Sequence, residues 1–200
     1  VDKLWKGKGG KVDWSRFGLK DSIYAELDKY ELEVNKSIYR TNNVKLHYPE
    51  IFPDGAIIGK FEDKIVSENR ATEGSYPRFE SRDSILQINN LGPGIEYVGG
   101  FRLHGTTLYG YGSKKKKAQI SIFDEDKKLT FKGDSELFVI RKGEKIAAER
   151  LEMVMYFNQD SIFHPSVNIK FNIPKQEMEL YRGKRGSDRN PFYNSLHKMN

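Results

Sequence analysis

Short segments that alternate apolar and polar residues recur roughly every ten residues over 30–180, and this rhythm constrains the fold more than any other feature. Alternation with a period of two sends successive side chains to opposite faces of a β-strand. Clusters of Gly, Pro, Asn and Asp separate the segments, as turns between strands require. The pattern predicts an all-β protein with little or no helix, built as a sandwich, a jelly roll or a solenoid-like stack of rungs.

Residues 23–32 are the one stretch that fits both a helix and a strand. Ile23, Leu27 and Tyr30 would share a helical face, whereas Ile23, Ala25 and Leu27 also alternate as in a strand. The alternation changes phase before Tyr30, and a β-bulge explains such a change because it inserts one extra residue. We therefore expect a bulged strand here.

The expected strands suggest two parts, which could also form one continuous domain. Residues 1–112 form a β-rich N-terminal part with a long polar loop at 62–79, and residues 113–200 form regular rungs that end in a polar tail. The strand expected at 151–157 is apolar on both faces, which predicts burial on both sides. The expected strands are 44–48, 57–61, 84–88, 95–97, 100–103, 107–111, 119–123, 129–132, 136–141, 145–148, 151–157, 167–173 and 178–181.

Composition excludes several kinds of chemistry. The 200 residues include no cysteine, so disulfides and thiolate sites are excluded. The four histidines have no spacing that would place two imidazoles of one element on a metal, so we expect neither a metal site nor a cofactor. No apolar run reaches the length of a membrane-spanning helix, so we expect no transmembrane segment.

Basic residues exceed acidic ones by 34 to 28, which gives a net charge of +6. The one sharp cluster runs from Lys114 to Lys117, between two expected strands. We expect a solvated turn, because exposed lysines also protect sheet edges from aggregation. The alternative is a patch that attracts phosphate or anionic lipid.

Residues 158–165 contain Asp160, Ser161 and His164, the three residue types of a hydrolase triad. Closeness in sequence is no argument for a triad, because triads assemble from separate elements. The chain also has no Gly-x-Ser-x-Gly elbow to expose a nucleophile. We expect a structural turn in which Asp160 or Ser161 binds nearby backbone amides.

Aromatic residues on consecutive expected strands are the best candidates for binding. If they face solvent, their rings offer flat surfaces to a sugar or to a partner strand; the alternative is that they fill the core. Single-stranded nucleic acid could use such aromatic and basic residues, but no RNP-like string accompanies them, so we expect no nucleic-acid partner. The candidates are Tyr97, Phe101, Arg102, His104, Tyr109 and Tyr111.

Six segments resemble an interior portion of very large, uncharacterised envelope proteins of Gram-negative bacteria. They are WKGKGGKVDW at 5–14, GKFEDK at 59–64, YPRFES at 76–81, YVGGFRLHG at 97–105, DSIFHP at 160–165 and NPFYNSLH at 190–197. The resemblance implies a piece of a longer protein that lies in the periplasm or at the cell surface. It implies no particular chemistry.

A weaker similarity covers residues 133–180, whose rhythm looks like the rungs of lipopolysaccharide-transport (OstA-like) β-jelly rolls. Such domains hold acyl chains in an open trough. The similarity implies that Met153, Met155 and Phe157 would line an apolar trough, a role that adaptable Met and Phe side chains suit.

Three hypotheses follow. The first is a non-catalytic β-rich structural or interaction segment of a larger extracytoplasmic bacterial protein, whose partners are other segments of that protein or other envelope proteins. The second is a module that binds glycan or lipid. The third is a hydrolase whose site is assembled by the fold.

Overall fold

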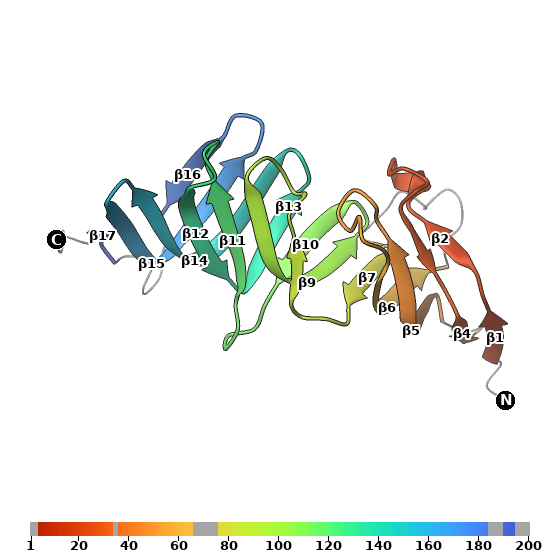
Figure 1. Ribbon diagram of the computed structural model, residues 1–200. Coiled ribbons are helices and arrows are strands. Elements are labelled where there is room, and N and C mark those ends of the chain that lie inside the picture. Colours follow the sequence, from red (N-terminus) through yellow and green to blue (C-terminus); the bar gives the residue numbers. More distant parts are fainter. Residues whose placement is uncertain (1–3, 34–35, 66–75, 184–189, 195–200) are drawn as a thin grey trace. The chain divides into compact units, whose positions relative to one another are not determined.

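The computed structural model describes residues 4–33, 36–65, 76–183 and 190–194, and this part of the chain is all-β (Figure 1). Its strands pair antiparallel, and the 3₁₀ turn η1 (Ser15–Phe17) is the only helical element within these ranges. None of the described residues forms a helix of the length and apolarity that crossing a membrane requires. The prediction of an all-β protein is confirmed.

The chain divides into two compact units, each made of two separate stretches of the sequence. Unit 1 comprises Val1–Ser84 and Phe101–Leu108, and unit 2 comprises Ile85–Gly100 and Tyr109–Asn200. The division crosses two strands, β9 (Ile95–His104) and β10 (Thr107–Tyr111), so each of them contributes residues to both units. The sequence pattern predicts a boundary after residue 112, or one continuous domain.

Unit 1 is organised around the long strand β5. Strand β4 pairs with the first part of β5 and β3 with its last part, both along one edge. Strand β6 pairs with the other edge of β5, β7 pairs with β6, and the end of β9 pairs with β7. The bulged strand expected at 23–32 is thus two strands, β3 and β4, interrupted at 27–28, and the helical alternative is wrong. The strands are β1 (Leu4–Lys8), β2 (Lys11–Asp13), β3 (Tyr24–Glu26), β4 (Lys29–Glu33), β5 (Ile38–His47), β6 (Ile57–Lys64) and β7 (Arg78–Ser81).

The core of unit 1 is aromatic, and a bulge in β5 adjoins it. Trp14 and Phe61 are buried and meet edge to face, with ring centroids 6.2 Å apart. In β5, the register shifts between Thr41 and Val44, so Asn42 and Asn43 both face solvent between two buried residues. Asn43 has a left-handed backbone conformation, with φ of 60°. A bulge of this kind bends a strand and re-aims its side chains.

Unit 2 is built on the hairpin of β14 and β15, each 13 residues long (Figure 1). The first part of β14 pairs with β13 and its last part with β12, while β15 pairs first with β17 and then with β16. Both long strands therefore change neighbours midway, as corner strands do when they pass between packed sheets. The strands are β8 (Leu86–Ile88), β11 (Ala118–Phe123), β12 (Leu129–Ser135), β13 (Leu137–Arg141), β14 (Lys145–Phe157), β15 (Asp160–Asn172), β16 (Glu177–Tyr181) and β17 (Tyr193–Asn194).

Several expected boundaries are wrong. The strands predicted at 95–97 and 100–103 form the single strand β9, and those at 145–148 and 151–157 form β14. The loop predicted at 62–79 is a strand at both ends, in β6 and β7, and its residues 66–75 lie outside the described ranges. Glu152 is exposed, so 151–157 is not buried on both faces.

Candidate functional site

Tyr97 and Phe101 are core residues. Tyr97 is fully buried, donates its hydroxyl to the carbonyl oxygen of Gly100 at 2.6 Å, and meets Phe138 edge to face. Burial raises the pKa of this hydroxyl. A Cβ at Gly110 would lie 2.4 Å from the Tyr97 ring, so this strand glycine makes room for the ring.

The six aromatic and basic candidates are divided between the units. In unit 1, Phe101 is buried, and its ring meets that of Phe52 edge to face, with ring centroids 5.1 Å apart. Arg102 and His104, also in unit 1, are half-buried. In unit 2, Tyr109 and Tyr111 are half-buried. The buried rings of Tyr97 and Phe101 offer no surface to a ligand. Among the candidates of unit 1, Arg102 and His104 are the two that a ligand could reach.

Arg102 and His104 belong to a charged face of unit 1, formed by cross-strand neighbours on β5, β6, β7 and β9. Arg102 pairs with Glu80 at 3.0 Å, and Glu62 binds Arg40 and Arg78. A shallow pocket of about 310 Å³ lies on this face. The charged face consists of Arg40, Lys60, Glu62, Arg78, Glu80, Arg102 and His104.

His104 lies half-buried among the cations and carboxylates of the charged face. Burial lowers the pKa of the His104 imidazole below its ordinary value, and the neighbouring Arg78 and Arg102 lower it further. Cross-strand ion pairs of this kind stabilise the sheet that carries them. Four cations against two carboxylates also give the face a modest attraction for anions.

Asp160, Ser161 and His164 are bound into the fold. The turn lies at residues 158–159, and the segment that follows, predicted as a turn, is the beginning of β15. His164 is fully buried; its Nδ1 accepts the Ser166 amide at 3.0 Å, so its Nε2 carries the proton and donates to the Asn190 carbonyl at 2.8 Å. Asp160 accepts the Ser161 amide at 2.7 Å, the backbone bond that the sequence predicted.

The three expected trough residues share one face of β14 and become more exposed along it. Met153 is 1% exposed, Met155 is half-buried and Phe157 is 50% exposed. Met155 lies between Phe131 of β12 and Ile162 of β15 in register. Phe131 is 3% exposed and belongs to the core, whereas Met155, Phe157 and Ile162 are at least partly exposed, and we call these three the open end of unit 2.

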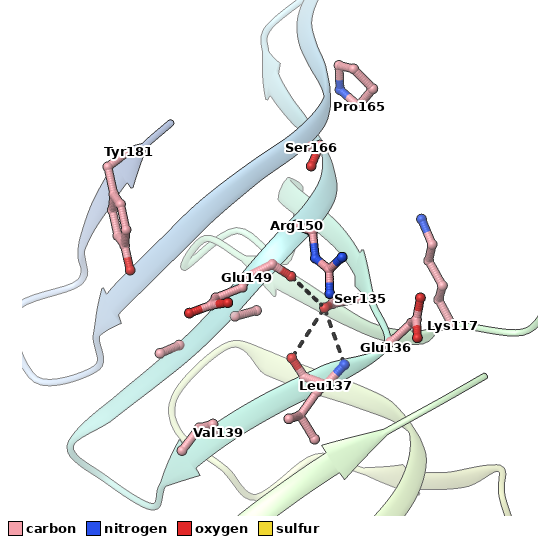
Figure 2. A pocket seen from close by; sticks show the side chains of 12 residues that line it. Lys117, Ser135, Glu136, Leu137, Val139, Glu149, Arg150, Pro165, Ser166 and Tyr181 are labelled. Carbon is pink, nitrogen blue, oxygen red and sulfur yellow. Dashed lines mark hydrogen bonds between the residues drawn. The ribbon is translucent and has the colours of Figure 1, made fainter. Parts of the chain in front are cut away.

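A second pocket, of about 540 Å³, lies on unit 2 where its strands change direction (Figure 2). In β14, Glu149 and Arg150 stand opposite the single residue Asn168 of β15, because Ala148 pairs with Ile169 and Leu151 with Val167. We call this pocket of unit 2 the corner pocket. It is lined by Lys117, Ser135, Glu136, Leu137, Val139, Ala147, Ala148, Glu149, Arg150, Pro165, Ser166 and Tyr181.

Hydrogen bonds fix the backbone of the corner pocket. The buried hydroxyl of Ser135 lies 3.2 Å from the carbonyl oxygens of both Leu137 and Glu149, and it accepts the Leu137 amide (Figure 2). Its one proton can be donated to either carbonyl. The amide of Arg150 donates to Asn168 Oδ1 at 3.0 Å. The backbone that carries Leu137, Glu149 and Arg150 is therefore held in place by the fold itself.

Alternation in the sequence does not predict the corner pocket, although the sequence contains a signal of it. The expected strands at 145–148 and 151–157 left a gap at Glu149 and Arg150, two successive polar residues between two alternating runs. That gap is the bulge. Lys117 is the part of the lysine cluster that reaches this pocket, where it pairs with Glu152 at 3.2 Å; Lys114, Lys115 and Lys116 are exposed in the turn, as expected.

The comparisons with known proteins assign no relative. The chain matches no protein-family model, no curated protein and no solved structure. Across the described residues, no three acidic or histidine side chains gather in a way that could hold a metal ion. The geometry of the two units is therefore the basis for any functional proposal.

Proposed function

We propose that this chain is a non-catalytic structural or interaction segment of a larger extracytoplasmic bacterial protein. In this proposal, a further β-rich part of that protein packs against the open end of unit 2. The observation that carries it is the loss of burial along one face of β14, from 1% exposure at Met153 to 50% at Phe157. The extracytoplasmic location rests on the sequence resemblance.

The open end continues the core of unit 2. In register, the sealed layer contains Met153 and the fully buried His164, and the next layer contains Met155 and Ile162, which are only half-buried. Uncovered apolar side chains that extend a core favour association, because each large one stabilises a contact by about 1.5–3 kcal/mol when buried. A neighbouring β-rich unit would add the missing layer.

The same residues favour a second candidate function, the binding of an acyl chain. Met155 and Phe157 are adaptable apolar side chains, and they lie on the face that the similarity to lipopolysaccharide-transport rungs assigns to a trough. The two functions differ in what covers the open end: a protein layer or a lipid.

Sedimentation velocity tests the proposal, because an apolar end that lacks its covering layer should associate with the same end of a second copy of the chain. We expect concentration-dependent self-association, and Phe157→Ser should weaken it about tenfold because one large apolar contact is lost. Ile58→Ser is the matched control, since Ile58 is 42% exposed on unit 1. A strictly monomeric chain, or equal weakening by both variants, would contradict the proposal; native mass spectrometry with a fatty acid would then decide for or against the lipid candidate.

A further inference from the structure

Irregularities in neighbouring strands of unit 2 coincide at the corner pocket. In β14, Glu149 and Arg150 form a bulge, and in β15, Pro165 and Ser166 fill the space opposite the single residue Glu152. At the same level, the chain turns from β12 into β13. Bulges bend strands where sheets turn, and they also re-aim side chains at binding sites. Their alignment here builds a pocket and not only a bend.

The bulge places successive side chains on one face. A regular strand would bury either Glu149 or Arg150, yet both are exposed between the buried residues Ala148 and Leu151. Arg150 adopts a left-handed backbone conformation, with φ of 50°. Such a conformation in a non-glycine residue persists only where the surrounding structure holds it, and strained residues cluster at functional sites.

The rim of the corner pocket carries balanced charges. Arg150 and Lys117 are basic, and Glu136 and Glu149 are acidic. A polyanion would therefore meet two carboxylates, and an acyl chain would have to desolvate several charged groups. The rim instead offers donors and acceptors in pairs, the arrangement that hydroxyl groups require because each hydroxyl both donates and accepts.

The rest of the pocket is apolar and partly aromatic. Leu137, Val139 and Tyr181 are 43%, 36% and 40% exposed, so they present apolar surface that a ligand can contact. The Nζ of Lys170 lies 5.3 Å from the centroid of the Tyr181 ring and helps to orient it. Aromatic and aliphatic groups bind the C–H faces of sugar rings, whose hydroxyls project from the edge.

We propose that the corner pocket binds a short uncharged oligosaccharide. Tyr181 and Leu137 contact the apolar face of a sugar ring, while Glu149 accepts and Arg150 donates hydrogen bonds to its hydroxyls. The volume of about 540 Å³ falls in the range of small-ligand sites. Because Ser135 and Asn168 bind the backbone of Leu137, Glu149 and Arg150 before any ligand arrives, little backbone entropy is lost on binding.

The test is an array of neutral and anionic oligosaccharides probed with the whole chain, followed by calorimetry on the strongest neutral hit. We expect Glu149→Gln and Tyr181→Ala each to weaken binding about tenfold or more, because a charge-assisted hydrogen bond or a ring contact is lost. Glu125→Gln, an exposed change in the turn between β11 and β12, is the control and should bind like the wild type.

Three results would overturn the proposal: no neutral oligosaccharide binds, binding is unchanged in Glu149→Gln and Tyr181→Ala, or only anionic glycans bind and salt abolishes the signal. Circular dichroism of each variant separates lost binding from lost folding. The proposal goes beyond the structural role and does not depend on it, because Phe157→Ser leaves the corner pocket intact and the Glu149 variant leaves the open end intact.

Discussion

The buried polar side chains of His164, Ser135 and Asp63 serve the fold. Each nitrogen of the His164 imidazole is bound to a backbone group, and the Ser135 hydroxyl bridges two strands at a corner. Asp63 is 6% exposed and pairs with Arg16 at 3.2 Å, and burial raises the pKa of its carboxyl. A buried polar group is costly unless it is hydrogen-bonded, which explains why these residues are tied to backbone and to opposite charges.

His104 should make stability depend on pH. Its pKa in the folded state lies below the ordinary value of 6.5, through burial and then Arg78 and Arg102, opposed by Glu80 and Glu62. The unfolded chain therefore binds a proton that the folded chain does not. This contribution is fully present above about pH 6.5 and is lost as the pH falls from there towards the folded-state pKa.

Thermal melting followed by circular dichroism checks this prediction. From about pH 7.5 to pH 5.5, the melting temperature should fall further for the wild type than for His104→Gln, because the glutamine side chain does not titrate. Parallel curves for the two proteins would show that His104 does not contribute.

At the level of the element, the bulge in β14 depends on the backbone of Arg150. Glycine adopts positive φ without strain, whereas a β-branched residue there is strongly disfavoured. We expect Arg150→Gly to leave the free energy of unfolding nearly unchanged and Arg150→Val to lower it by about 1–2 kcal/mol. Urea denaturation measures both, and equal stabilities would contradict a requirement for positive φ.

The elements show which information a local pattern contains. Alternation predicted most strands of unit 2, and it predicted strands at 23–32, because a period of two is visible without knowledge of the partner strand. It divided β14 in two, since a bulge looks like a gap until the register with β15 is known. Residues 158–161 look like a turn in the sequence because Asp160 and Ser161 can bind nearby backbone amides. In the structure only residues 158 and 159 form the turn, and β15 begins at Asp160.

The candidate sites were harder to predict, because alternation separates two faces without saying which one is the core. Tyr97 and Phe101 fit an exposed aromatic face as well as a buried one, and the structure places both in cores. Arg102 and His104 lie two residues apart on the charged face, as alternation requires. The corner pocket combines residues of five strands with Lys117 and Glu136 from the connections between strands, so no local pattern contains it.

For the whole molecule, the two units should respond separately to core damage. Phe79 of unit 1 and Leu151 of unit 2 are fully buried, and their replacement by alanine should cost about 3–5 and 2–5 kcal/mol. Hydrogen–deuterium exchange should rise mainly in Val1–Ser84 and Phe101–Leu108 for Phe79→Ala, and mainly in the remaining residues for Leu151→Ala. Uniform increases along the chain in both variants would argue against two units.

Both units contain the same device: an outward pair of residues between two buried ones, the second with a left-handed backbone. The pair is Asn42 and Asn43 in β5, and Glu149 and Arg150 in β14. The first residue of such a pair can be exchanged for other side chains, and the second for residues that tolerate positive φ, while the alternating core positions on either side stay the same. A scaffold of this kind can diversify what it displays without redesigning its interior, so these two sites are natural places to graft a new recognition surface.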